Sequence, residues 1–340
     1  MRPKKKASMK DIAGTVGVSI NTVSRALSYK PGINEKTRQL IIKTAQDVGY
    51  EYENGVPSRP QSEKDRTIGL VITDNANPFF AQVVRGVQNL LWQHRYTLIL
   101  CNTNEDYAQE RGAVEMMLER KVAGIILTPT QSKDQDISLI QDSGIPFVLM
   151  GRHFSNHKVP NVVIDDKQGA YSAIEHLVRL GHTRILFINA PKYISSAQER
   201  YDGYVAALLD NGIQLDDSLI RTSEPNVDAA CNEMKSICIE QLQYTAIFTF
   251  CDLMMLGVLK VLQERGIEIP KKYSLVSFDD IDFVSLLKPP LTTVHVNKYK
   301  MGEDSARMLL SIIRGENLFE QTVIIPTKLI IRGSTVKLGQ

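Results

Sequence analysis

From Thr67 onward, short apolar runs alternate with amphipathic helical stretches, and this alternation limits the possible folds more than any other feature. Each apolar run has the length of a buried strand, and the runs cover residues 68–72, 98–100, 124–127, 146–149, 162–164, 185–188, 246–250 and 275–278. Helical periodicity separates the first four runs, over about 79–94, 105–120 and 134–143. Such alternation is typical of parallel sheets with helices on both faces. The pattern predicts an α/β fold.

The strand-like runs form two similar series, the second following residues 162–164. Two sheets of similar build joined by short crossovers imply two lobes around a cleft. Ligands of open parallel sheets bind beyond the carboxyl ends of the strands. We therefore expect a small-molecule site among the polar residues that follow each strand.

The segment before this region predicts two short helices joined by a tight turn, within residues 9–27. Apolar residues fall on one face of each helix, so that the helices can share a small core: Ile12, Ala13 and Val16 on the first, and Val23, Ala26 and Leu27 on the second. Ser8 and Ser19 can cap the helices, and Gly17 suits the turn.

A third helix is predicted over residues 35–48, capped by Asn34 and stopped by Gly49. Its apolar stripe is expected to contain Leu40, Ile41, Ala45 and Val48. Residues 51–66 combine glycine, prolines and many charges, which predicts a flexible linker.

The open surface at the start of the second helix carries a set of residues that suits DNA: Ser19, Ile20, Asn21, Thr22, Ser24 and Arg25. Hydroxyls bond phosphates, whereas an amide and a guanidinium can bond base edges. The pattern predicts a helix-turn-helix that binds DNA.

The charge distribution agrees with this prediction. Residues 1–50 hold ten Lys or Arg against three acidic residues, a net charge of +7, whereas the whole chain carries only +2. By itself, Lys4-Lys5-Lys6 is interpreted more simply as a solvated tail. Beside a helix-turn-helix, a basic arm adds attraction to phosphates.

The sequence contains little evidence for other functional classes. It contains no apolar run of about 18 residues and no signal-peptide core. The four cysteines and six histidines lack metal-ligand spacing, and neither a nucleophile elbow nor a P-loop occurs. We expect a cytoplasmic protein with reduced thiols, no metal, no cofactor, no catalytic residues and no membrane partner.

Several motifs, in order along nearly the whole chain, resemble the LacI/GalR family of bacterial repressors. Besides the helix-turn-helix, they are TIGL at 67–70, NPFF at 77–80, VAGII at 122–126, LGH at 180–182, RYDG at 200–203, FDD at 278–280, PLTT at 290–293 and RGS at 332–334. The resemblance implies an N-terminal DNA-binding domain, a hinge, and a two-lobed effector domain of the type I periplasmic binding protein kind.

On this basis we expect a helix-turn-helix domain at 1–50, a hinge at 51–66 and an effector-binding and dimerisation domain at 67–340. Within the last domain, lobe one is expected to cover about 67–163 and 292–320, and lobe two about 164–291 and 321–340. The resemblance implies three crossovers between the lobes, the last near 290–296. The chain stops soon after Arg332-Gly333-Ser334 without a heptad tail, so we expect a homodimer. Because it is expected to bind DNA, we place it at the bacterial nucleoid.

The family's DNA contacts carry over by position. Ile20, Asn21 and Arg25 correspond to residues that read the major groove, and Ser19, Thr22 and Ser24 to phosphate contacts. Arg25 can pair with guanine and Asn21 with adenine, whereas Ile20 can only contact a thymine methyl or fill the interface. A twofold dimer implies a palindromic operator. The alternative for Asn21 is an ordinary solvent-facing residue.

The family's effector-site residues also correspond to positions in this chain. Arg200 matches an arginine that binds the ligand, and Asp279 matches an aspartate that binds a ligand hydroxyl. The remaining candidates are Thr73, Asp74, Asn77, Phe79, Phe80, Ser196 and Phe250. The alternative for Arg200 is a surface ion pair with Glu199 or Asp202. The two phenylalanines could equally be core residues, and Asp280 could serve only as a helix cap.

Three departures from the family pattern stand out. The hinge offers only Val56 as a minor-groove wedge and resists helix formation, so we expect weaker hinge-dependent bending of DNA. Cys251 replaces an asparagine that often holds a sugar hydroxyl, leaving Asp252 as an N-cap for a helix over 253–265. Val296 occupies a position that is often polar, and Ser223 one that is aromatic in some relatives. These differences argue against a standard neutral hexose as the effector and leave a smaller, acidic or unusual sugar as an alternative.

The leading hypothesis is a repressor of a carbohydrate-metabolism operon, controlled allosterically by a sugar or sugar derivative. The alternative is a catabolite-control regulator whose main input is a phosphocarrier protein. A periplasmic sugar-binding protein would share the two lobes, but the basic helix-turn-helix argues against it.

Overall fold

The computed structural model describes residues 8–27, 33–48, 50, 66–318 and 320–339. The chain divides into two compact units, Met1–Lys64 and Asp65–Gln340. The second unit contains both lobes predicted from the strand and helix pattern. The predicted linker and the helix stop at Gly49 lie outside the described residues, apart from Arg66.

The first unit is helical, with α1 at Met9–Val16, α2 at Ile20–Leu27 and α3 at Glu35–Asp47. Ser8 forms a capping box with Asp11, and Gly17 ends α1 at a φ of 74°. The Ser19 hydroxyl accepts from the Thr22 backbone N–H at 3.1 Å, and Asn34 Oδ1 accepts from the Lys36 N–H at 3.0 Å. The predicted caps are confirmed.

The three helices share a small core, formed by Ile12, Ala13, Val23, Ala26, Leu27, Ile41 and Ala45. The buried Arg38 guanidinium donates to the Ala26 carbonyl at 3.0 Å and so satisfies the last turn of α2. The expected stripe on α3 is wrong at two positions, because Leu40 is 52 % and Val48 39 % exposed. Of the four residues in the expected stripe, Ile41 and Ala45, one turn apart, lie in the core.

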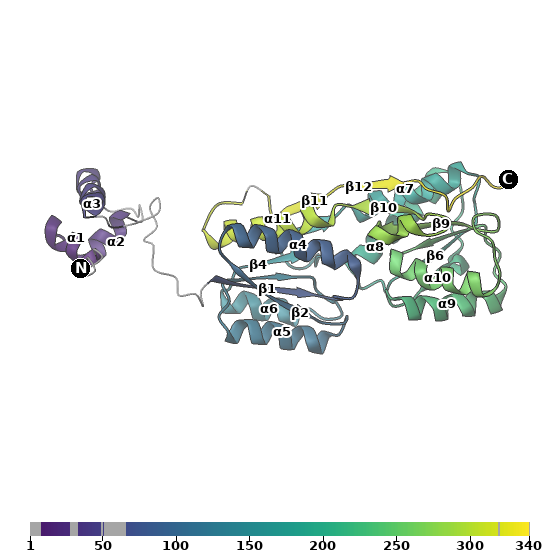
Figure 1. The fold of residues 1–340 in the computed structure, drawn as a ribbon, viewed down its shortest axis with the longest axis horizontal. Coiled ribbons are helices and arrows are strands. Elements are labelled where there is room, and N and C mark those ends of the chain that lie inside the picture. Colours follow the sequence, from purple (N-terminus) through teal and green to yellow (C-terminus); the bar gives the residue numbers. More distant parts are fainter. Residues whose placement is uncertain (1–7, 28–32, 49, 51–65, 319, 340) are drawn as a thin grey trace. The chain divides into compact units, whose positions relative to one another are not determined.

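Lobe one contains a sheet with the strand order β11-β5-β4-β3-β1-β2, in which all neighbours are parallel. Its strands are β1 (Thr67–Ile72), β2 (Thr97–Asn102), β3 (Gly124–Leu127), β4 (Phe147–Met150), β5 (Asn161–Ile164) and β11 (Thr322–Ile325). Figure 1 shows α4 (Pro78–Gln93) and α11 (Lys298–Ile313) on one face, and α5 (Tyr107–Glu119) and α6 (Gln135–Ser143) on the other.

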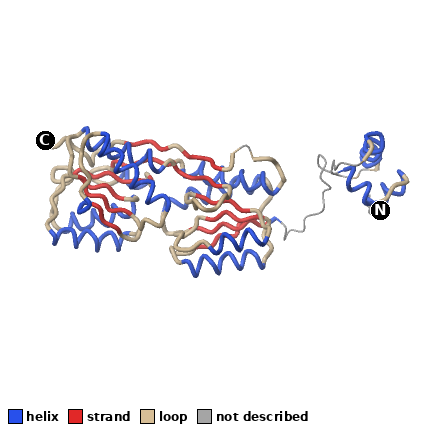
Figure 2. The backbone as a smooth tube through the Cα atoms, turned by 180° about the vertical axis from the view of Figure 1, so that it is seen from behind, coloured by secondary structure: helices blue, strands red, loops and turns tan. Residues whose placement is uncertain are grey.

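Lobe two repeats this architecture with the order β12-β10-β9-β8-β6-β7, and only β12 runs antiparallel to its neighbour. Its strands are β6 (Ile185–Asn189), β7 (Ile220–Thr222), β8 (Ala246–Thr249), β9 (Ser274–Asp279), β10 (Thr292–Val296) and β12 (Thr327–Ile330). The helices are α7 (Asp166–Arg179), α8 (Ser195–Asp210), α9 (Val227–Glu240) and α10 (Asp252–Glu264), with 3₁₀ turns η2 (Asp217–Leu219) and η3 (Asp282–Leu286). Figure 2 shows both sheets between their helices.

The chain passes between the lobes three times: after β5, between β10 and α11, and between β11 and β12. Two expected assignments are therefore wrong. Residues 292–296 belong to lobe two, because β10 pairs with β9 and β12, and residues 322–325 belong to lobe one, because β11 pairs with β5. The last crossover consequently lies at residue 326, not near 290–296.

Candidate functional site

The first candidate site is the open face of α2. It consists of the exposed Ser19, Ile20, Asn21 and Arg25, with Thr22 and Ser24 half-buried beside them. Asn21 and Arg25 are one helical turn apart, so their side chains leave the same face and can enter one groove. Ser19 holds the first turn, since its Oγ also lies 2.8 Å from the Thr22 hydroxyl. Val56, the expected wedge, lies outside the described residues.

The second candidate site is a cavity of about 510 Å³ between the lobes. It is lined by every residue that the sequence placed in the effector site: Thr73, Asp74, Asn77, Phe79, Phe80, Ser196, Arg200, Phe250 and Asp279. These residues follow the carboxyl ends of parallel strands or begin the next helix, as expected for an open α/β sheet.

Lobe one contributes the turn between β1 and α4. Asn77 caps α4, and its Oδ1 accepts from the Phe79 N–H at 3.0 Å. This cap brings Phe79 and Phe80 to the cavity in an edge-to-face pair, with ring centroids 5.3 Å apart. Each ring is less than one-tenth exposed. The phenylalanines therefore belong to both the core and the cavity wall.

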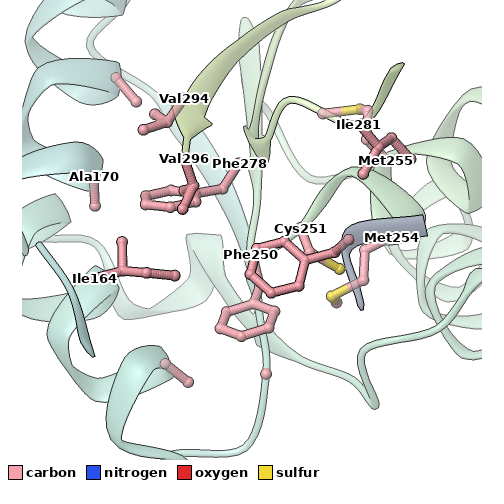
Figure 3. Close-up of a cluster of buried hydrophobic side chains, with 14 of the residues drawn as sticks. Ile164, Ala170, Phe250, Cys251, Met254, Met255, Phe278, Ile281, Val294 and Val296 are labelled. Atoms are coloured by element: carbon pink, nitrogen blue, oxygen red, sulfur yellow. The ribbon is translucent and has the colours of Figure 1, made fainter. Parts of the chain in front are cut away.

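Lobe two contributes a buried guanidinium. Arg200 is 3 % exposed, and its Nε donates to Asp166 Oδ1 at 2.8 Å while Nη1 donates to the Phe250 carbonyl. The Phe278 and Phe250 rings lie 3.6 and 4.3 Å from its Cζ, which adds cation–π attraction. Figure 3 shows both phenylalanines within the surrounding apolar cluster. The surface ion pair with Glu199 or Asp202 is wrong, since Asp166 is the partner.

Asp279 ends β9 with an unusual backbone conformation, at a φ of 110°. Its Oδ1 lies 3.8 Å from Arg200 Nη2. Burial raises the pKa of Asp279, and Arg200 offsets this only in part because its closer carboxylate is Asp166. A protonated Asp279 can donate a hydrogen bond as well as accept one.

Sequence reasoning missed a second arginine in the cavity wall. Arg152 Nη1 and Nη2 donate to the two Glu105 oxygens at 2.8 and 2.6 Å, and Nη1 also reaches the Pro129 carbonyl at 3.0 Å. Arg152 follows β4, and Glu105 follows β2. The rule that selected Asp74, polar residues just after a strand, would have found both.

The other missed lining residues are Asn104, Thr128, Gly151, Ile164, Tyr193, Glu224, Pro225, Asn226 and Met301. Residues 224–226 follow β7, a strand of three residues that no apolar run in the sequence predicted. Tyr193 stands in the loop before α8 and is half exposed.

Two further expectations on lobe two are wrong. Asp252 is the first residue of α10, not its cap, and its carboxylate accepts from the Ile281 N–H and the Thr293 hydroxyl, each at 2.8 Å. Asp280 caps no helix; its oxygens bind Arg332 at 2.7 Å and His295 at 2.9 Å. Both carboxylates fix the strand ends around Asp279.

Of the departures noted in the sequence, only Cys251 lines the cavity. Burial raises the pKa of its thiol, so the side chain remains neutral and bonds weakly. Val296 is buried near the Phe278 ring (Figure 3). Ser223 does not line the cavity, although the next residue, Glu224, does.

The cavity and the exposed helix define a class of protein: a DNA-binding regulator with a ligand-binding module. A family model for bacterial regulatory proteins of the lacI family matches residues 8–52. A second model, for periplasmic binding proteins and the sugar-binding domain of the LacI family, matches residues 65–333. The chain belongs to the LacI family and is a DNA-binding transcriptional regulator.

Relatives match nearly end to end. The HTH-type transcriptional repressor PurR of Vibrio atlanticus is 30 % identical over 332 residues, covering 97 % of this chain and 99 % of the relative. Catabolite control protein A of Priestia megaterium is 29 % identical, with 96 % and 98 % covered. A structure of the regulator CelR with cellobiose superposes with a TM-score of 0.74 at 26 % identity, covering 97 % of this chain and all of that one.

These comparisons confirm the predicted family and fold. Within the described part of the chain, no helix is long and apolar enough to cross a membrane.

Proposed function

We propose that this regulator is a homodimeric repressor of a carbohydrate-metabolism operon, whose affinity for a palindromic operator changes when a neutral, hydroxyl-rich ligand occupies the interlobe cavity. The observation that carries the proposal is the cavity itself, where residues from both lobes converge around Arg200 and Asp279. Occupancy of a site shared by two lobes can shift their arrangement and so act on a distant DNA-binding unit.

The charge balance favours a neutral ligand over an acidic one. Both arginines of the lining are already paired with carboxylates, Arg152 with Glu105 and Arg200 with Asp166. Asp74 and Glu224 add further negative charge to the wall. An anionic ligand would meet this charge without a free cation, whereas hydroxyls can use the arginine, amide and carboxyl groups. Phe79 and Phe80 suit an apolar sugar face, and the related CelR structure holds cellobiose.

The proposal is tested by a thermal-shift screen of the full chain against neutral sugars, sugar acids and nucleosides. A ligand at 100 times its dissociation constant stabilises by about 2.7 kcal/mol. Tyr193→Ala should reduce the shift given by any active compound, because Tyr193 lines the cavity yet is half exposed. Leu209→Ala, at an exposed position outside the cavity, should leave it unchanged. Shifts from sugar acids alone would contradict the neutral ligand.

Base reading is assigned to Asn21 and Arg25, with Ile20 against a thymine methyl and with Ser19, Thr22 and Ser24 at phosphates. Selection of bound sequences from a random DNA pool would give the operator. Arg25→Ala and Asn21→Ala should each cost roughly 1–3 kcal/mol at one base pair of each half-site. Gln39→Ala, exposed on α3, provides the control. A uniform loss at all positions would contradict base reading.

The dimer is supported by the edge of the first sheet. β2 is the terminal strand, and its apolar sequence TLILCN contains no fully buried residue. A second copy would cover this edge. The chain is proposed to act by binding alone, without catalysis, and in the cytoplasm beside the chromosome. Should no compound stabilise it, the similarity to catabolite control protein A would favour a phosphocarrier protein as the input.

A further inference from the structure

Three hydrogen bonds beside the cavity close into a ring, and two of them join the lobes. In lobe one, Gln131 Nε2 donates to the His153 carbonyl at 2.6 Å. The His153 backbone N–H then donates to Ser195 Oγ of lobe two at 3.1 Å. The Ser195 backbone N–H returns to Gln131 Oε1 at 2.8 Å. We call these three residues the interlobe ring.

The ring supplies a cap that α8 lacks in its own sequence. The N-cap position of α8 is Ile194, which has no side-chain acceptor for the first-turn N–H groups. Gln131 provides that acceptor from the other lobe. Separation of the lobes would leave the first N–H of α8 without this partner, so closure and capping are one event.

Contacts within lobe one hold Gln131 in position. It adopts a φ of 66°, in the left-handed region, and is only 8 % exposed. Its bond to His153 lies within lobe one and directs the amide oxygen toward α8. A preorganised amide loses little conformational entropy when the second bond forms.

The ring adjoins the cavity on both sides without lining it. Arg152 immediately precedes His153, and Ser196 immediately follows Ser195; both Arg152 and Ser196 line the cavity. One turn further along α8 stands Arg200. The ring therefore joins the two chain segments that carry the arginines.

We infer that Gln131 is a positioning residue that latches the lobes in the closed arrangement before any effector binds, so that effector affinity depends on a side chain outside the cavity. This inference rests on the proposed function for its effect on ligands, but the latch itself needs no ligand. Loss of the one Gln131 bond that crosses between the lobes should shift the closure equilibrium by roughly 2- to 10-fold toward opening.

The test is amide hydrogen exchange at single-residue resolution on the full chain without ligand. Each variant removes one of the two interlobe bonds, and the exchange rate is read at the backbone amide that donates the other. Gln131→Asn keeps an amide but shortens it, and the His153 amide should exchange at least about threefold faster. Ser195→Ala removes only the hydroxyl, and the amide of residue 195, corrected for its intrinsic rate, should also accelerate. Gln141→Ala, exposed on α6 of the same lobe, should change neither.

If each variant affects only its own bond, Gln131 is a local cap and the latch is overturned. In the thermal-shift screen, Gln131→Asn should also weaken the shift from each neutral sugar or nucleoside that stabilises the parent chain. A screen without any active compound would overturn the proposed function and leave the exchange result standing.

Discussion

The buried carboxylate of Asp166 holds the guanidinium on which the cavity depends. Asp166 is 1 % exposed and accepts from Arg200 Nε at 2.8 Å. Asp166→Asn would leave a buried cation with a neutral partner, so we expect the free energy of unfolding to fall by about 3 kcal/mol, measured by urea denaturation. Asp202→Asn, on the helix of Arg200 at a position first considered as its partner, should change the free energy of unfolding by less than about 0.5 kcal/mol. Equal losses would contradict the assignment of the pair.

Glu110 predicts a pH dependence of stability. It is fully buried on α5, where burial and the neighbouring Asp136 raise its pKa to about 9, against about 4.3 in an unfolded chain. Between these values the folded state holds a proton that the unfolded state releases. Stability is therefore present at low pH and is lost as the pH rises toward 9.

Glu110→Gln imitates the protonated carboxyl and keeps an acceptor for the Thr130 N–H. From pH 6 to 9 the parent chain should lose of the order of 1 kcal/mol per pH unit, whereas this variant should lose much less, as urea denaturation at each pH would show. Glu115→Gln removes an exposed carboxylate from the same helix and should follow the parent. Parallel curves for the parent chain and Glu110→Gln would refute a proton held at Glu110.

At the scale of elements, α4 and α11 touch backbone to backbone through two glycines. A Cβ on Gly302 would lie 2.1 Å from the Val83 carbonyl oxygen, and one on Gly86 equally close to the Tyr299 oxygen. Gly302→Ala must push the helices apart, which should cost about 2–4 kcal/mol in thermal or urea unfolding and disturb the cavity wall at Met301. Gly112→Ala, inside α5 with open space around it, should instead stabilise by roughly 0.5–1 kcal/mol. A neutral Gly302→Ala would disprove the close packing.

The elements also show how far sequence reasoning reaches. Apolar runs predicted β1 to β6, β8 and β9, and strand ends led to Asp74, Phe250 and Asp279 in the cavity. Sequence reasoning missed β7, β11 and β12, which are short, weakly buried edge strands. It also missed the buried strand β10, whose sequence TTVHV is not continuously apolar. The partner of Arg200 was missed because Asp166 is 34 residues away, and no local pattern reports such a contact.

For the whole molecule, the order of lobes along the chain was the hardest property to predict. Local periodicity identifies a strand but not its sheet, and the last two crossovers depend on the pairing of β10 with β9 and of β11 with β5. The segment 292–296 was therefore placed in the wrong lobe. The cavity was still located, because both lobes direct their strand ends toward it whichever segment crosses.

The proposed dimer predicts a link between the sheet edge and DNA. Leu100 on the terminal strand β2 is 41 % exposed, and a lysine there would put charge where a second copy is proposed to pack. We expect Leu100→Lys to yield monomers in sedimentation experiments. Each monomer carries one helix-turn-helix and engages one half-site, so operator affinity should fall roughly 100-fold or more through lost avidity. Leu209→Lys, at an exposed site on lobe two, should preserve both dimer and affinity. A dimeric Leu100→Lys variant with full operator affinity would move the interface away from β2.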